Sequence, residues 1–223
     1  MRSQINGLNQ AVNNANDAIG LIQTAEGAMT ETHSMLQRMK TLSTQAANGT
    51  YTKTARDNIK AEIDALNKEI TRIATTTEFN GEKPLSPDTT TKNLTFFIGA
   101  SADASNAMTV AQMTMTAKAL TIDGIKVDNT TNAFKAMKSI DAAIEKVSTY
   151  RATLGAAQNR LEHTVNNLKV TSENITSAES RIRDTDMADE ITAYTKNNIL
   201  LQAAQSMLSQ SNAMPQGVLS MLQ

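Results

Sequence analysis

Seven apolar residues in the second half of the chain recur at intervals of seven: Ile140, Val147, Leu154, Leu161, Leu168, Ile175 and Ile182. A heptad repeat of this kind keeps one line of side chains facing a neighbouring helix over many turns. The line three residues before it starts apolar, with Met137 and Ile144, and then becomes mixed. The pattern predicts one helix from about residue 134 to 182, a rod on the order of 70 Å long.

The first half of the chain carries a matching helical pattern. Apolar residues alternate spacings of three and four from Ile5 onward and continue, with a drift in phase, to Leu42. Asn48-Gly49 then gives a stop signal. A second helix is predicted to begin near Thr54 as its cap and to end at Thr75–Thr77, where β-branched residues weaken helix propensity. Its apolar face consists of Ile59, Ile63, Leu66, Ile70 and Ile73.

The middle of the chain has a different pattern. Leu94–Ile98 is short, β-branched and aromatic, and Met108–Met115 alternates in part, so the two predict a hairpin. Asp123-Gly124 marks a turn that would fit a further hairpin of neighbouring residues. The predicted fold is therefore mainly α: a long antiparallel helical rod, like a coiled-coil bundle, with a small β-hairpin region in the middle. Four regions are expected: 1–79, 80–130, 131–183 and 184–223.

Composition limits the classes of function. Aromatic residues make up 3% of the chain and Trp is absent, so burial must come from aliphatic and Met side chains along helix seams. The net charge of −1, with basic and acidic residues spread along the chain, does not favour nucleic acid as a partner. No apolar run approaches the roughly 20 residues that cross a membrane. The absence of Cys excludes disulfides and thiolate chemistry.

Several blocks of residues carry more information than helical periodicity requires. They are Ile5–Ala11, Asp17–Ala28, Leu36–Met39, Gln45–Gly49, Thr77–Gly81, Phe97–Ala100, Ala178–Ala188, Ile199–Met207 and Pro215–Leu219. In this order the blocks resemble those of the bacterial flagellins. We expect two departures from the family pattern. A first segment of about fifty residues is lacking, and most of the variable outer domains are missing apart from the region around residues 82–130.

The resemblance implies a structural subunit of the bacterial flagellar filament. Such a subunit is exported unfolded through a type III apparatus, assembles with other flagellin subunits outside the cell and needs no cofactor. In the family, the region after about residue 184 forms half of a coiled coil in the filament core and is covered by an export chaperone before assembly; a second flagellin-binding regulator exists in some bacteria. The matching apolar residues are Met187, Ile191, Tyr194, Leu201, Met207, Leu208, Val218, Leu219 and Leu222.

An exposed apolar stripe of this length is a binding surface or a liability. Without its family partner, the segment is expected to be disordered, self-associated or held by another molecule. The chain alone is not expected to form filaments.

The resemblance also implies that the vertebrate Toll-like receptor for flagellin recognises the chain. The matching positions are Gln37, Arg38, Leu42, Gln45 and Glu62. Thr41 stands where many recognised flagellins have Glu, which bears on the strength of binding. The alternatives are structural: Arg38 and Glu62 can form a solvated ion pair, worth about 0–1 kcal/mol, and Leu42 can pack in the core.

Two other functional classes are less well supported. His33 and His163 have no second ligand or base at a useful spacing, so neither a metal site nor an enzyme is expected. Asp184, Asp186, Asp189 and Glu190 can hold a cation or, more simply, supply negative charge at the start of the following helix. A non-flagellar helical adaptor or coiled-coil binding module would also fit the helices, but it has no reason to keep the ordered blocks.

Overall fold

The structure is a computed structural model that describes residues 1–86, 93–101, 103–184 and 186–221, with only the backbone described from residue 213 onward. Four long helices account for most of it: α1 (Arg2–Ala47), α2 (Lys53–Thr76), α3 (Thr130–Arg183) and α4 (Met187–Met221). Two short strands, β1 (Asn93–Phe97) and β2 (Ala107–Ala111), flank the 3-10 turn Ala104–Asn106. The chain divides into two compact units, residues 1–175 and 176–223.

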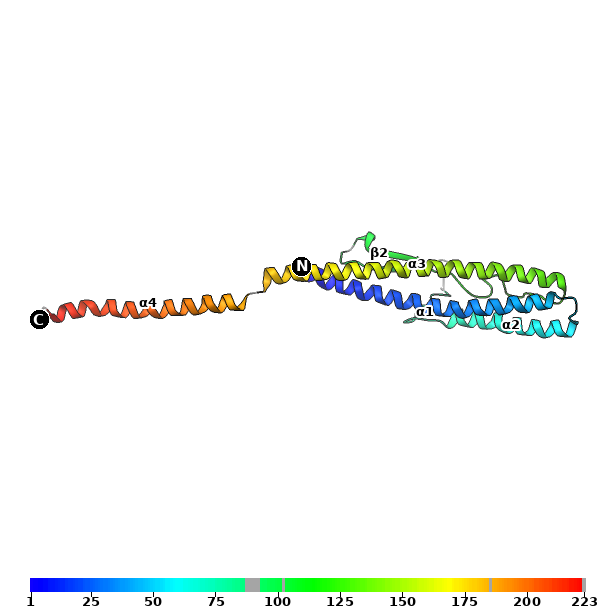
Figure 1. Cartoon of the computed structure of the whole chain (residues 1–223), viewed down its shortest axis with the longest axis horizontal. Helices are drawn as coiled ribbons and strands as arrows, with labels where there is room; N and C mark the ends of the chain where they lie inside the picture. The colour runs from blue at the N-terminus through cyan, green and yellow to red at the C-terminus, as the bar shows by residue number, and fades with distance from the viewer. Residues whose placement is uncertain (87–92, 102, 185, 222–223) are drawn as a thin grey trace. The chain divides into compact units, whose positions relative to one another are not determined.

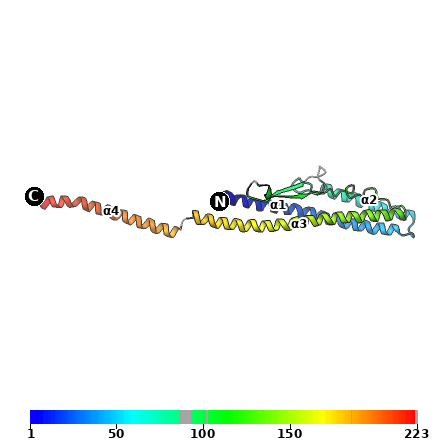
Figure 2. The ribbon, with the colours of Figure 1, turned by 90° about the horizontal axis from the view of Figure 1, so that it is seen from above.

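The first unit is a bundle in which α1 and α3 run antiparallel. The two helices lie side by side in Figures 1 and 2, with α2 against α1. Asn9, near the start of α1, contacts Ser172, whereas Lys40, near its end, forms an ion pair with Asp141 on α3 at 2.7 Å. The prediction of a mainly helical, antiparallel rod is therefore confirmed.

The line of residues at seven-residue spacing is buried along most of α3. Ile140, Val147, Leu154, Leu161 and Leu168 are all buried, Ile175 is half-buried, and Ile182 is 77% exposed. Leu168 packs against Leu8 and Ala11 in the first turns of α1, and Ile182 belongs to the second unit.

The companion line differs from the prediction. Met137 and Ile144 are only half-buried. Ala136, Ala143, Tyr150 and Ala157, each one residue before a companion position, pack in the interior beside the main line, and Val165 of the companion line itself is also buried. Three of these four side chains are alanines with little apolar bulk, which is why a search for large apolar residues does not find them.

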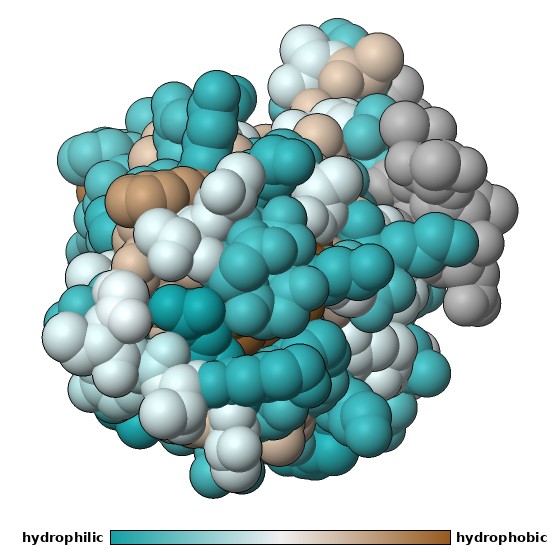
Figure 3. Space-filling model, turned by 90° about the vertical axis from the view of Figure 1, so that its right-hand side faces the viewer, coloured by the Kyte–Doolittle hydropathy of each residue, from teal (hydrophilic) through white to brown (hydrophobic). Residues whose placement is uncertain are grey.

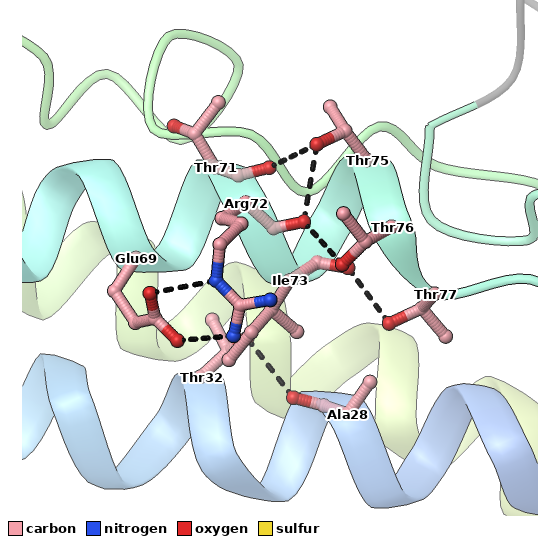
Figure 4. A network of polar contacts seen from close by, with 9 residues as sticks. All are labelled: Ala28, Thr32, Glu69, Thr71, Arg72, Ile73, Thr75, Thr76 and Thr77. Atoms are coloured by element: carbon pink, nitrogen blue, oxygen red, sulfur yellow. Dashed lines mark hydrogen bonds and ion pairs between the residues drawn. The ribbon is translucent and has the colours of Figure 1, made fainter.

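The start of α2 lies slightly earlier than predicted. Thr52, not Thr54, is the N-cap: its backbone is extended and its hydroxyl accepts a hydrogen bond from the Ala55 N–H at 3.3 Å. The end at Thr76 agrees with the prediction. There, the hydroxyl of Thr75 donates to the carbonyl of Thr71, that of Thr76 to Arg72, and that of Thr77 to Ile73, as Figure 4 shows.

The predicted hairpin is confirmed, with a shorter second strand. β1 and β2 pair antiparallel, with Leu94 opposite Val110 and Phe96 opposite Met108, so Met113 and Met115 lie beyond the strand. The hairpin lies against α1, where Asn14 donates to the carbonyl of Phe97 at 3.0 Å. Gly7 allows Ala100 to approach α1 closely, since a Cβ at Gly7 would lie 3.2 Å from the Ala100 Cβ.

No second hairpin forms around Asp123-Gly124. Residues 112–129 contain no strand, although Leu120, Ile122, Ile125 and Val127 are buried. The segment turns repeatedly, with Thr121 at φ 61 and Gly124 at φ 69. It lies over α2, because the buried Asn67 donates to the carbonyl of Ile122 at 2.9 Å. The apolar residues of this segment alternate with polar ones as in a strand. Here they are buried because the segment packs on α2, not because it pairs in a sheet.

The corner between α1 and α2 is closed by Arg56. Its Nε donates to the carbonyl of Ala46 at 3.0 Å and its guanidinium to the carbonyl of Asn48 at 3.1 Å. These two acceptors lie at the end of α1, where carbonyl groups have no partner within the helix. Asn48 ends the helix in an extended conformation (φ −73, ψ 130). The helix therefore ends at the predicted stop signal, but Gly49 does not adopt a left-handed backbone there.

Candidate functional site

Four of the five expected receptor-binding residues lie on one exposed part of α1 and α2. Gln37, Arg38, Gln45 and Glu62 are all exposed. The Arg38 Nε donates to Glu62 Oε1 at 2.8 Å, and a second guanidinium nitrogen approaches the same oxygen at 2.7 Å. Because both side chains are about half exposed (53% and 44%), this ion pair is largely solvated. It orients the guanidinium and leaves it accessible.

The fifth expected residue, Leu42, lies elsewhere. Its exposed fraction is 2%, and it belongs to the main apolar core. Leu42 therefore packs in the interior and is not on the accessible surface. Leu42 lies four residues after Arg38, on the same side of the helix. The boundary between the buried and the exposed surface of α1 runs between the two side chains, so Leu42 is buried and Arg38 is exposed.

Hydrogen bonds within α1 and its corner hold the neighbouring polar side chains. The Gln37 side-chain nitrogen lies 2.9 Å from the His33 Nε2, and Gln45 donates to the Tyr51 hydroxyl at 2.9 Å. The Thr41 hydroxyl donates to the Gln37 carbonyl at 3.1 Å. Thr41 is thus bound to its own helix, and its side chain is shorter than the Glu expected there.

The second candidate surface is α4. The side chains of Met187, Ile191, Tyr194, Leu201, Met207 and Leu208 are between 57% and 71% exposed, and Ile199 and Leu200 are similar. The side chains of Val218 and Leu219, and the whole of Leu222, lie outside the described residues. Ile191, Ile199 and Leu200 line a shallow hollow with the methylene-rich Lys196.

α4 forms a continuous helix with exposed apolar side chains. The expectation that these side chains are covered, by self-association or by another molecule, stays a prediction. Two local features explain the helix. Its sequence is rich in Ala, Leu, Met and Gln, which have high helix propensity. Asp186 Oδ1 also accepts a hydrogen bond from the Ala188 N–H at 2.9 Å and so caps the first turn.

The acidic residues around the start of α4 stabilise the beginning of this helix. Asp189 and Glu190 lie in its first turn, where the helix dipole favours negative charge. Within the described ranges, no three His, Cys, Asp or Glu residues are placed to hold a metal ion. Among the same residues, no helix is long and apolar enough to cross a membrane.

Tyr150 is the one buried ionisable group in the described part of the chain for which a shift is evident. Burial between the helices raises the pKa of its phenol, and a backbone hydrogen bond from Met113 acts in the opposite direction. The side chain lies on the inner line of α3, with an exposed fraction of 3%. Its position indicates packing, since no other ionisable group is drawn into the interior beside it among these residues.

Comparison with known proteins identifies the family. Residues 1–90 match the bacterial flagellin N-terminal helical region, and residues 137–222 match the bacterial flagellin C-terminal helical region. The chain is 47% identical to the flagellin of Bacillus subtilis (strain 168), with all of this chain and 83% of that protein aligned. The chain belongs to the bacterial flagellin family. It is a structural subunit of the flagellar filament, an extracellular appendage built from flagellin subunits.

Two further relatives agree with this identification. Flagellin FlaB2 of Treponema pallidum is 43% identical, with all of this chain and 82% of that protein aligned. The crystal structure of Bacillus cereus flagellin superposes with a TM-score of 0.60 at 33% identity, and covers 75% of this chain and 94% of that one. The family is one of structural proteins, which favours a structural role over the adaptor and enzyme alternatives.

Sequence reasoning did not find the residues that fix the corner and the hairpin. Arg56 joins the end of α1 to the carbonyl of Asp128 ahead of α3 at 3.5 Å. Gly20 allows the Phe79 ring to lie against α1, since a Cβ there would be 3.4 Å from the ring. No short-range pattern indicates either contact, because each joins residues distant in the sequence.

Proposed function

We propose that this flagellin assembles with other subunits through α4. The observation that supports the proposal is the exposure of its apolar side chains, including Ile199, Leu200 and Leu201. Three consecutive residues of an α-helix point in three directions about 100° apart. A helix with apolar residues on several faces is normally covered on several faces. Neighbouring subunits that surround α4 would provide such cover, whereas one shallow groove would cover only part of it.

The test is co-assembly with a close relative. The labelled chain would be mixed with polymerising flagellin of Bacillus subtilis, and the fraction that sediments with the filaments measured. We expect Leu201→Glu to reduce this fraction and Gln202→Glu, which adds the same charge at the next position, to leave it close to that of the unsubstituted chain. Equal sedimentation of both variants, or none of the unsubstituted chain, would contradict the proposal.

We also propose that the chain is exported unfolded through the flagellar type III apparatus and that, before assembly, a flagellar export chaperone covers α4. The absence of Cys supports this route, because no disulfide can oppose unfolding. A chaperone groove would cover one apolar face of α4, in the mode in which a helix lays apolar anchors into an apolar groove. Titration calorimetry with the Bacillus subtilis chaperone should show tight binding that Leu201→Glu weakens more than Gln202→Glu. Binding of a flagellin-binding regulator can be tested in the same way.

Arg38 and its exposed neighbours support a second function. We propose that Gln37, Arg38, Gln45 and Glu62 contact the vertebrate Toll-like receptor for flagellin. Arg38 has a planar donor fork on a long apolar stem, the type of side chain found at binding hot spots. Glu62 Oε1 lies 2.7–2.8 Å from two nitrogens of this guanidinium and so holds it in place at the surface. A receptor carboxylate or carbonyl could accept hydrogen bonds from the guanidinium nitrogens that point to solvent.

The test is binding of the receptor ectodomain to the chain and to Arg38→Ala. We expect the substitution to cost about 2 kcal/mol or more, as for a central hot spot. Arg72→Ala is the matched control, because Arg72 is an exposed arginine paired with Glu69 on α2. Equal affinities for all three proteins would leave Arg38 with only the role of a surface ion pair.

A further inference from the structure

Two methionines on α4 are more exposed than any other methionine whose side chain the structure describes. Met187 and Met207 are 63% and 71% exposed, whereas Met1 and Met113 in the first unit reach 48% and 41%. The remaining described methionines of the first unit are buried or half-buried: Met29, Met35, Met39, Met108, Met115 and Met137. The thioether groups most open to solvent are therefore both on α4.

Both methionines continue lines of apolar residues along α4. Met207 follows Leu200 by seven residues, and Met187 begins a line at the same spacing that continues with Tyr194, Leu201 and Leu208. Residues seven apart lie on nearly the same side of a helix, because seven residues make almost two full turns. All these side chains are exposed. The two sulfur atoms therefore belong to the apolar surface of α4 and are not isolated from it.

We propose, on the basis of the assembly role proposed for α4, that oxidation of Met187 and Met207 to methionine sulfoxide by a peroxide blocks assembly. The sulfoxide is polar and replaces a flexible apolar side chain, so each apolar line acquires a polar group. A neighbouring subunit that covers the sulfoxide without donating a hydrogen bond to it incurs the cost of burying an unpaired polar group. Methionine sulfoxide reductases reverse the change, so the two residues form a redox switch.

The reaction transfers one oxygen atom. A lone pair of the thioether sulfur attacks an oxygen of the peroxide, the O–O bond breaks, and the S–O bond of the sulfoxide forms. With hydrogen peroxide, the leaving hydroxide takes up the proton of the transferred oxygen and departs as water. The sulfur loses two electrons and the peroxide gains two. Methionine and hydrogen peroxide therefore give methionine sulfoxide and water, and no other reactant is needed.

The first unit protects its own sulfur atoms. Seen from the end where α1 ends and α2 begins, this unit is covered mainly by hydrophilic residues (Figure 3). Met39, near that end of α1, is fully buried and belongs to the main core with Leu36. The half-buried Met137 accepts a hydrogen bond at its sulfur from the Thr44 hydroxyl at 3.2 Å. A peroxide in solvent therefore reaches the sulfur atoms of α4 more readily than those of the core.

The selectivity is tested by treating the folded chain with dilute hydrogen peroxide and following each methionine by peptide mass spectrometry. We expect Met187 and Met207 to be oxidised at least about tenfold faster than Met29 and Met39, which react only when the bundle opens. In concentrated urea the four residues should react at similar rates, because burial no longer distinguishes them. Similar rates in the folded chain would overturn the inference.

The effect on assembly is tested by sedimentation with polymerising Bacillus subtilis flagellin, added after the peroxide has been removed. The unsubstituted chain is compared with the double variant Met187→Leu and Met207→Leu and with Met113→Leu, each treated and untreated. Leucine keeps the apolar volume and the helix propensity but has no sulfur. After treatment, sedimentation of the unsubstituted chain and of Met113→Leu should fall several-fold, whereas that of the double variant should stay close to its untreated value.

The untreated chain separates this inference from the assembly role itself. Failure of the untreated chain to sediment would overturn the assembly role and the redox switch together. Undiminished sedimentation of a chain shown to be oxidised at both sites would overturn the switch and leave the assembly role standing. An equal loss by the treated double variant would assign the effect to other methionines, such as Met214 and Met221, and would overturn the assignment to Met187 and Met207.

Discussion

Arg38 on α1 donates to Glu62 on α2 at 2.8 Å, so an exposed ion pair between the first two helices coincides with the proposed receptor-binding surface. On the other side of α1, Lys40 reaches Asp141 on α3. Two residues apart in sequence, Arg38 and Lys40 thus bind to opposite neighbours. The contribution of Arg38 to receptor binding and its contribution to the stability of the bundle therefore need separate measurements.

The Arg38–Glu62 pair should add little to stability. Both side chains are about half exposed, so water screens their attraction. We expect Arg38→Ala to lower the free energy of unfolding by only about 0–1 kcal/mol, measured by urea denaturation. A small effect on stability together with a large loss of receptor binding would separate recognition from folding. A loss of several kcal/mol would show that the pair supports the bundle.

The line of residues at seven-residue spacing offers a matched pair of identical substitutions. Ile140→Ala removes a fully buried side chain and should cost about 2–5 kcal/mol. Ile182→Ala removes one that is 77% exposed and should change stability by no more than about 0.5 kcal/mol. Denaturant unfolding of the chain, followed by circular dichroism, compares the two. Similar costs would mean that the heptad position, not burial, determines the contribution.

The start of α2 can be tested with two threonines. Thr52→Ala removes the hydroxyl that accepts from the Ala55 N–H and should destabilise the chain by about 1 kcal/mol. Thr54→Ala changes a residue already inside the exposed first turn and should have little effect. Thermal unfolding measures both. A larger effect at Thr54 would restore the cap position that the sequence suggested.

Tyr150 should make stability depend on pH in the alkaline range. Its pKa is raised in the folded state by burial, so the folded chain holds the phenol proton more tightly than the unfolded chain does. The stability from this group is complete below the unfolded pKa of about 10 and is lost as the pH rises through the folded-state pKa. The free energy of unfolding should fall more steeply with pH in the unsubstituted chain than in Tyr150→Phe. Parallel curves would contradict this assignment.

The sequence predicts the helices of this chain well because local rules govern them. The heptad line of α3 and the threonine-rich end of α2 can be read from neighbouring residues. The errors occur where burial comes from distant contacts: the segment with Ile122 and Ile125 is buried by α2 without forming strands. Asn67, which binds this segment, has no sequence signal of its own.

The candidate surfaces were predictable to different degrees. The match to the family's receptor-recognised positions selected Arg38 and Glu62, which are exposed, but it also included Leu42, which is buried. Residue spacing shows which side chains share one side of a helix only to within about half a turn. Which of them are buried depends on the neighbouring helices, which the spacing does not reveal. The apolar residues of α4 are visible in the sequence, but its helix was implied only through the resemblance, as half of a coiled coil.

The most direct test of the account is amide hydrogen exchange along residues 187–212 of α4, measured in the chain alone and after co-assembly with Bacillus subtilis flagellin. The backbone around Leu161, buried in the first unit, provides the internal reference. We expect exchange in α4 to be fast in the chain alone and strongly slowed in the assembly, while the reference is slow in both. Exchange in α4 that stays equally fast after co-assembly would contradict the claim that α4 is the assembly surface.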